Sequence, residues 1–334
     1  ISGTINGPYD LTITTDGTLT LEGSSTYTGN TTVNEGILKI SHSNGLGNSS
    51  GVTNVSDGAT LQITGGITVS EPITLSGDGN SSLGTLNFLS GDNTYSGAIT
   101  LGSNTSIKSS AGNQTISGTI NGPYDLTITT DGTWTQSGEI GGITPIANYS
   151  LNADVNNISL SGDHQVAGPI SVYGGTIVIN SNLTTTGDSA NTILLKAIGN
   201  ITQASGIDIT TDGADVIYWA DSDADDAGYI NFTDGGHNII TNGGDVIMAG
   251  GSGTTEPTGY AHGGGAGAGI NLLNSTTSAK IDTRKVSDVA GNILIRGKTS
   301  GAFSGIYTEN IQFFGNDLIL DGVTGSTGTN DYAI

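Results

Sequence analysis

The sequence predicts an all-β protein in which the chain winds into a coil and each turn pairs in parallel with the next. Gly occupies 55 of 334 positions, more than twice the usual share of about 7%, and charged residues make up only 11%. Thr, Ile and Val recur in short alternating runs between turn residues, which is typical of strands and not of long helices. A long internal repeat is the third observation.

The repeat is exact. Residues 1–18, ISGTINGPYDLTITTDGT, recur unchanged at residues 116–133. Eighteen identical positions do not arise from composition alone, so the segment has been duplicated in tandem. Tandem modules indicate an array-like, elongated molecule.

Between the two copies, apolar pairs separated by one residue alternate with turns rich in Gly, Asn, Asp and Ser. Each pair predicts a strand of three to five residues with one apolar face. With about 20 residues in a turn, we expect about 15 turns, a core column of Ile, Leu and Val, ladders of like Thr and Asn residues, and Gly at the corners. The apolar groups are Leu11/Ile13, Leu19/Leu21, Ile37/Leu38/Ile40, Leu61/Ile63, Ile73/Leu75, Leu86/Phe88 and Ile99/Leu101.

The formal net charge is −22, from 30 acidic and 8 basic residues spread along the chain. Such a chain repels nucleic acid and attracts divalent cations. There is no Cys, so neither a disulfide nor a Cys-ligated metal is available. No apolar run reaches the 18 or more residues that a membrane span needs. The chain begins at Ile1, and we expect it to be a segment of a longer protein.

Residues 16–38, DGTLTLEGSSTYTGNTTVNEGIL, closely resemble the autotransporter-associated β-strand repeat, whose pattern is G-x-L-T-L-x-G-x-N-T-Y-x-G-x-T-x-V-x-x-G-x-L. This chain has Ser25 where the family has Asn. A second copy at residues 91–101 matches the middle of the pattern, with Asn93 in the Asn position, and diverges after it.

Segments of the second half are similar to the G-G-[DN]-[IV]-x-[IL]-x-[AG] turns of filamentous-haemagglutinin-like exoproteins. They lie at residues 193–202, 243–251 and 290–297. The two resemblances imply a right-handed parallel β-helix in a secreted or surface-attached bacterial protein that acts as an adhesin. We therefore predict a solenoid over residues 1–138 with the 115-residue tandem repeat, continued over residues 139–334 with haemagglutinin-like turns.

One acidic loop, residues 221–228, is a candidate calcium site. Asp221, Asp223 and Asp225 reproduce the first three ligand positions of a D-x-D-x-D calcium loop, in which oxygen ligands two residues apart converge on one ion. The sixth position is Asp226 instead of Gly, and the twelfth is Phe232 instead of Glu. The alternative is a solvated acidic loop without an ion.

Aromatic residues flank this loop. Exposed aromatic side chains are the usual platforms for sugar rings, so Tyr218, Trp219 and Tyr229 are the candidate glycan-binding residues, although Trp219 also suits a packed corner.

Three other features are weaker candidates. The glycine-rich stretch 259–269 predicts a loop bulging from one turn, and His237 and His262 lack an evident further ligand for a shared metal. Basic residues cluster late in the chain, where they suit either an anionic glycan or the neutralisation of acidic loops on neighbouring turns. These are Lys280, Arg284, Lys285, Arg296 and Lys298.

The sequence favours a structural stalk or fibre segment of a large secreted or cell-surface bacterial adhesin. The expected partners are a glycan or protein on a host or neighbouring cell, or further copies in a fibre, and no nucleic acid. A carbohydrate-binding module is the alternative. A polysaccharide lyase or hydrolase on a β-helix ranks below both, because the acids show no distinctive catalytic pair and basic residues are scarce before residue 270. We expect no enzyme activity.

Overall fold

The computed structural model is an all-β parallel solenoid of about 13 turns. It describes residues 1–233, 235–263, 267–273, 279–285, 290–300 and 304–324. Within these ranges there is no α-helix, only a short 3-10 turn, η1 (Asn80–Ser82). The same ranges contain no helix with the length and hydropathy of a membrane span. The predicted coil of parallel strands is confirmed.

The chain divides into two compact units. Unit 1 comprises residues 1–156 and 161–163, and unit 2 comprises residues 157–160 and 164–334. The change of repeat type expected after residue 138 concerns the sequence pattern, and it stays a prediction.

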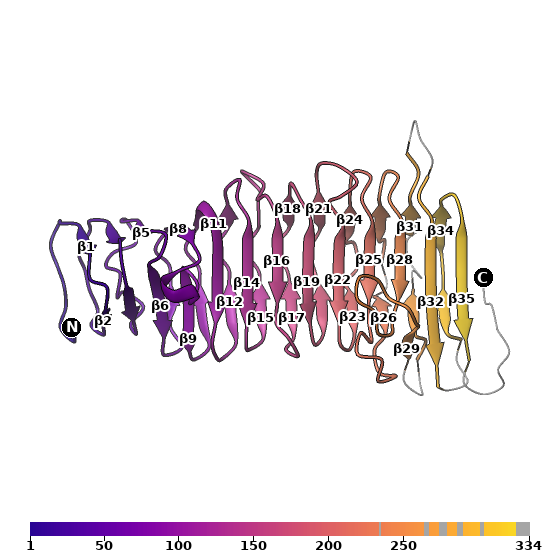
Figure 1. The fold of residues 1–334 in the computed structure, drawn as a ribbon, viewed down its shortest axis with the longest axis horizontal. Helices are drawn as coiled ribbons and strands as arrows, with labels where there is room; N and C mark the ends of the chain where they lie inside the picture. Colours follow the sequence, from indigo (N-terminus) through magenta and orange to yellow (C-terminus); the bar gives the residue numbers. More distant parts are fainter. Residues whose placement is uncertain (234, 264–266, 274–278, 286–289, 301–303, 325–334) are drawn as a thin grey trace. The chain divides into compact units, whose positions relative to one another are not determined.

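In unit 1, each face is a column of short parallel strands taken from successive turns (Figure 1). The long strand β11 contributes to two of the three columns. The first column is β1 (Leu11–Ile13), β3 (Thr31–Val33), β5 (Thr53–Val55), β8 (Ile73–Gly77), β11 (Ile99–Ser109) and β13 (Ile120–Asn121). The second is β2 (Thr18–Leu21), β4 (Ile37–Ile40), β6 (Thr60–Thr64), β9 (Leu86–Ser90), β11, β14 (Leu126–Thr130) and β16 (Tyr149–Asn152). The third is β7 (Thr68–Val69), β10 (Asn93–Tyr95), β12 (Gln114–Ile116) and β15 (Trp134–Gln136).

Unit 2 is also built from three parallel columns, and Figure 1 shows its strands side by side. The first is β17 (Ile158–Leu160), β20 (Ile177–Ile179), β23 (Ile201–Gln203), β26 (Ile230–Phe232), β30 (Ile270–Leu272) and β33 (Ile306–Thr308). The second is β18 (His164–Val166), β21 (Leu183–Thr185), β24 (Asp208–Thr210), β27 (Asn238–Ile240), β31 (Ala279–Asp282) and β34 (Ile311–Phe314). The third is β19 (Ile170–Gly174), β22 (Ile193–Ala197), β25 (Val216–Trp219), β28 (Val246–Ala249), β32 (Ile293–Thr299) and β35 (Leu318–Val323), with β29 (Ala261–Gly263) also pairing β32.

The core of each unit is a column of like aliphatic side chains. Parallel register places equivalent positions of successive turns over one another, so each inward side chain packs on its counterpart one turn away. Burying each such side chain contributes about 1.5–3 kcal/mol. In unit 1 one column is Leu38, Leu61, Leu86, Ile107, Ile128 and Leu151. In unit 2 one column is isoleucine throughout: Ile158, Ile177, Ile201, Ile230, Ile270 and Ile306.

Turn length is nearly constant in the first turns and grows in unit 2. The register partners Leu11 and Thr31 are 20 residues apart, whereas Val246 and Ile293 are 47 apart. Part of this increase is residues 250–260, which belong to no strand. This growth explains why about 13 turns are observed where a uniform turn of about 20 residues predicts about 15.

Like polar residues form ladders at the surface, as predicted. Asn231 and Asn271 are register partners in β26 and β30, and the Nδ2 of Asn271 donates a 2.8 Å hydrogen bond to the Oδ1 of Asn231. This pair adds a side-chain hydrogen bond to the backbone ladder, and it ends there because the next register partners are Thr202 and Tyr307.

The duplicated segment occupies two different environments. Strand β14, in the second copy, pairs with both β11 and β16, whereas β1, in the first copy, pairs with β3. In the second copy, Ile116 is fully buried, and its register partners on the turns either side are Tyr95 and Gln136.

One corner of unit 1 is a ladder of glycines that, after Tyr9 in the first turn, has a single exception. A Cβ built on Gly118 would lie 1.8 Å from the carbonyl oxygen of Gly97, and one on Gly138 would lie 1.9 Å from that of Gly118. Backbones of successive turns therefore approach too closely here for a side chain. The corner positions are Gly29, Gly51, Glu71, Gly97, Gly118, Gly138 and Gly162, each preceded by Ser or Thr.

Residues 41–52 of the turn before Glu71 form no strand. Glu71 lines a hollow of about 220 Å³ together with polar residues of that segment. Its Oε1 accepts a 2.7 Å hydrogen bond from Thr53 Oγ1, and its Oε2 has no hydrogen-bond partner. The residue is only 3% exposed, and burial raises the pKa of its carboxyl group from 4.5 to about 7. The phenols of Tyr27 and Tyr95, whose pKa values burial also raises, are the titratable groups that Glu71 influences.

We predict that Glu71 makes the stability of unit 1 pH-dependent. A carboxyl group whose pKa is higher in the folded state stabilises the fold below its unfolded pKa, and that contribution is lost as pH rises through about 7. The free energy of unfolding should fall by about 2–3 kcal/mol more between pH 5 and pH 8 in the wild type than in Glu71→Gln, measured by denaturant titration. Glu35→Gln, which removes an exposed carboxylate, is the control. A Glu71→Gln protein with the full wild-type pH dependence would contradict this assignment.

Candidate metal centre

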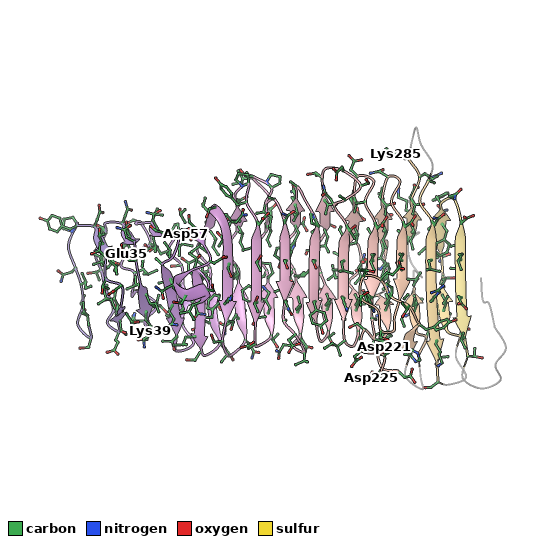
Figure 2. All side chains as sticks on the ribbon, in the orientation of Figure 1. Glu35, Lys39, Asp57, Asp221, Asp225 and Lys285 are labelled. Atoms are coloured by element: carbon green, nitrogen blue, oxygen red, sulfur yellow. The ribbon has the colours of Figure 1, made fainter. Side chains whose placement is uncertain are left out.

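The acidic loop lies between β25 and β26, and Asp221 and Asp225 of this loop are labelled in Figure 2. Its backbone is folded tightly: Ala224 N–H donates to the carbonyl of Asp221 at 3.1 Å, and Asp221, Ala224 and Asp226 have positive φ values. Aspartate tolerates this left-handed conformation better than most residues because its short side chain can bond locally. The alternation of Asp residues in the sequence therefore suits the turn as well as an ion.

Asp221 is the buried member of the loop, at 1% exposure. Its N–H donates to the carbonyl of Gly199 at 3.2 Å, and its own carbonyl accepts from Gly251 at 3.0 Å. Burial raises the pKa of the Asp221 carboxyl to about 6; the hydrogen bond from Ala227 N–H opposes this shift, and the charges of Asp225 and Asp223 add to it. A cation would offset the desolvation of this carboxylate.

The structure brings the predicted ligands together. One carboxylate oxygen from each of Asp221, Asp223 and Asp225 lies within 4.8 Å of the others. Asp223 and Asp225 are exposed, so water can complete the coordination shell of six to eight oxygens that calcium takes. Calcium binding here stays a prediction.

A second set that the sequence did not predict shares Asp221. Donor atoms of Asp221, Asp226 and His262 also lie within 4.8 Å of one another, and His262 Nε2 is 3.2 Å from Asp226 Oδ1. Burial lowers the pKa of His262, an effect that the Asp226 carboxylate opposes and Lys298 reinforces. His262 is 36 positions from Asp226, and no short motif connects them.

His237 does not belong to either set. Its ring packs against Phe232 at 5.1 Å between centroids, and its Nε2 is hydrogen-bonded with the carbonyl of Thr233. A metal shared by His237 and His262 is therefore not supported by this geometry.

Two of the three predicted glycan-binding aromatics are buried: Tyr218 lacks the expected exposure, and Trp219 is packed, which is the alternative that the sequence left open. Tyr218 points into the core, where its ring lies 5.6 Å from that of Phe232. Trp219 points the other way and is covered by the segment after β28, whose Gly251 carbonyl accepts its Nε1–H at 2.7 Å. Lys196 Nζ lies 3.9 Å from the Trp219 ring centroid. Tyr229, at 38% exposure, is the one of the three with an accessible face.

The glycine-rich stretch is not simply a bulging loop. Gly259 bridges Gly250 in antiparallel fashion, and β29 pairs with β32. Residues 264–266 lie outside the described residues.

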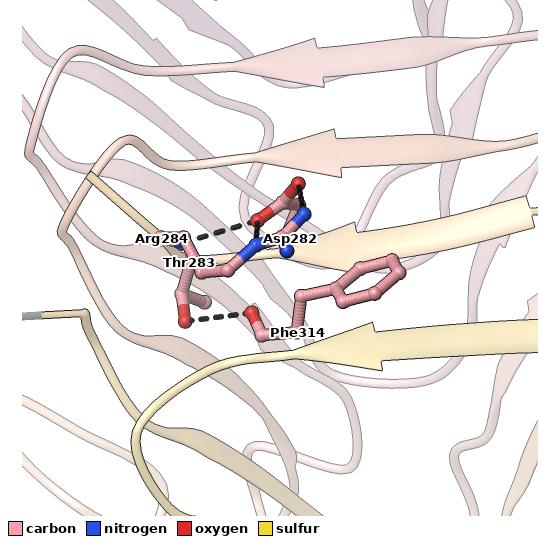
Figure 3. A network of polar contacts seen from close by, with 4 residues as sticks. All are labelled: Asp282, Thr283, Arg284 and Phe314. Carbon is pink, nitrogen blue, oxygen red and sulfur yellow. Dashed lines mark hydrogen bonds and ion pairs between the residues drawn. The ribbon is translucent and has the colours of Figure 1, made fainter. Parts of the chain in front are cut away.

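The late basic residues do not form one patch around the acidic loop. Arg284 donates two 2.8 Å hydrogen bonds to Asp282, and its guanidinium carbon lies 3.9 Å from the Phe314 ring centroid (Figure 3). Thr283 Oγ1 donates a 3.1 Å hydrogen bond to the Phe314 carbonyl beside them. Hydrogen bonds from Arg284 lower the pKa of Asp282. Arg296 faces Asp321 of the next turn at 3.9 Å. Lys285 lies on the side of unit 2 away from Asp221 and Asp225 (Figure 2).

Two segments of unit 1 match the family model of the passenger-associated transport repeat, at residues 15–40 and 81–103. The first contains β3 and β4, and the second contains β10. These are the regions whose motifs resemble the autotransporter-associated repeat. Repeats of this kind are typical of autotransporter passenger domains, which are in general secreted or exposed at the surface, and regions that carry them are usually non-catalytic. The comparisons gave no significant match to a curated protein or to a solved structure.

We predict that calcium stabilises unit 2 through the acidic loop. At a free concentration about 100 times its dissociation constant, an ion that binds only the folded chain adds about 2.7 kcal/mol. The thermal midpoint should rise with calcium and fall with chelator, and Asp223→Asn/Asp225→Asn should abolish the difference while Asp16→Asn preserves it. Equal wild-type midpoints with and without chelator would exclude a stabilising calcium ion.

Proposed function

We propose that this chain is a shaft segment of a secreted or surface-exposed bacterial protein of the autotransporter passenger type. The observation that carries the proposal is the combination of continuous parallel ladders within each unit and two matches to the passenger-associated repeat. A shaft needs turns that hold one another through many backbone hydrogen bonds, and it needs no catalytic site.

The loops outside the ladders support the second part of the proposal, that the shaft presents binding surfaces. The ladder fixes only the strands, so a turn can lengthen without disturbing its neighbours. The acidic loop 221–228 and the excursion 250–263 both lie where turns of unit 2 lengthen. In this proposal such loops, or further modules, contact a glycan or protein on another cell. A net charge of −22 keeps the shaft soluble and disfavours nucleic acid as a partner.

A carbohydrate-binding module is the second candidate, and Tyr229 is the observation that favours it. Tyr229 is exposed directly after the acidic loop, and its N–H is held by the Oδ1 of Asn200 at 3.0 Å. An accessible aromatic face beside carboxylates suits a sugar ring. With Tyr218 and Trp219 buried, however, this platform consists of one ring instead of three.

The shaft proposal predicts a gain in reach. The chain is placed between a bacterial surface anchor and an antigen-binding domain, and capture of antigen-coated beads through the cell's polysaccharide coat is measured. We expect several-fold more capture than with the domain anchored directly, and loss of the gain in Ile201→Asn, which breaks the isoleucine column.

No gain with a folded chain would contradict the shaft role. Purified chain that binds a glycan array saturably, and loses that binding in Tyr229→Ala but not in Tyr9→Ala, would favour the carbohydrate-binding module instead. Tyr9 is a suitable control because it is an exposed tyrosine of unit 1.

A further inference from the structure

We propose that Asp221, Asp226 and His262 form a binding site for a zinc-type divalent cation that fastens the excursion 250–263 to the acidic loop. This site differs from the predicted calcium loop in its ligand set, its metal class and its consequence for the fold.

The first observation is an interruption of the parallel pattern. After β28 the chain leaves the ladder, and 47 residues separate the register partners Val246 and Ile293. Two isolated antiparallel bridges form here: Gly250 with Gly259 closes the excursion on itself, and Gly228 with His262 ties it to the body. In the second bridge, His262 N–H donates to the Gly228 carbonyl at 2.6 Å, and Gly228 N–H donates to the His262 carbonyl at 3.2 Å. His262 is thereby held against the end of the acidic loop.

The donor geometry suits zinc. Zinc binds His nitrogen and carboxylate oxygen at about 2.0–2.1 Å, so two ligands of a tetrahedral site lie about 3.3 Å apart. His262 Nε2 and Asp226 Oδ1 are 3.2 Å apart, and all three donors fall within 4.8 Å of one another. Three protein ligands leave a fourth position for water. An imidazole donor favours zinc-type ions over calcium, which takes oxygen ligands.

Two of the three donor residues are buried and one is exposed. Asp221 and His262 are buried, and backbone hydrogen bonds hold both residues. Asp226 has a side chain that is 73% exposed, so it can close on the ion after the ion has entered. Because the calcium set also uses Asp221, the two cations compete for one carboxylate.

The bound ion would fix the segment around Gly251, which covers the Trp219 ring. The Gly251 N–H donates to the Asp221 carbonyl, and the Gly251 carbonyl accepts from Trp219 Nε1. Fixing the acidic loop to His262 therefore also fixes the segment that shields this ring. Trp219 is one of two tryptophans, and the other, Trp134, lies in unit 1, so Trp219 reports on the site.

The test is a zinc titration of the tag-free, chelator-treated chain, followed by calorimetry and by tryptophan fluorescence. We expect one saturable site, a change in Trp219 emission, and slower proteolysis within residues 250–263. His262→Asn and Asp226→Asn should each weaken zinc binding about tenfold or more, whereas Asp223→Asn/Asp225→Asn and the control His42→Asn should leave it within about twofold. Trp134→Phe, compared with the wild type, separates the two emissions.

Three outcomes would overturn the proposal. The absence of saturable zinc binding would mean that His262 and Asp226 form an ion pair and no metal site. Unchanged affinity in a folded His262→Asn would place the ion elsewhere. Loss of zinc binding in Asp223→Asn/Asp225→Asn but not in Asp226→Asn would assign zinc to the calcium-type loop. Thermal melts of every variant without metal establish that each is folded.

Discussion

The parallel hydrogen-bonded ladder between successive turns is the constraint on which the rest of the structure depends. It places equivalent positions over one another, so the inward positions repeat from turn to turn and most of them are apolar, although buried Thr31 and Thr53 share a column with Ile73. This explains why the core consists of columns such as the six isoleucines of unit 2. It also explains the composition, because short strands and close corners require Thr, Ile, Val and Gly more than charged residues.

The ladder also determines which positions can hold a charged or metal-ligating side chain. At the corner of unit 1, the carbonyl of one turn occupies the space in which the next turn would place a side chain, and glycine follows at six of the seven positions. Glu71 occupies the exceptional position, where a neighbouring segment forms no strand, and its carboxyl group is buried at a cost. In unit 2 the lengthened turns leave the ladder, and the clustered metal-ligating side chains of the described residues lie there. Irregular turns thus hold the unusual side chains in both units.

Much of the fold could be predicted from residue patterns, because a solenoid repeats a local rule. The alternations at Leu61/Ile63 and Leu86/Phe88 predict strands, and both pairs lie in them as register partners. The calcium-type aspartates could be proposed because ligands two residues apart are a local signal. The exception at Glu71 was also visible in principle, since a Ser-Gly or Thr-Gly pair precedes each neighbouring strand and Ser70-Glu71 replaces it once.

What could not be predicted depends on contacts between turns of unequal length. Trp219 ends an apolar strand and precedes an acidic loop, a position equally suited to exposure, and the return of residues 250–253 helps to cover it. His262 meets Asp226 because an excursion of unpredictable path brings it there.

The measurement that tests the ladder most directly is disulfide formation in the cysteine-free chain, because paired Cα atoms must lie within about 4.4–6.8 Å. Thr202→Cys/Asn231→Cys and Asn231→Cys/Asn271→Cys join register partners and should oxidise to intramolecular disulfides, whereas Thr202→Cys/Asn271→Cys, two turns apart, should not. Cross-linking of the last pair, or failure of both others, would contradict the parallel stacking described here.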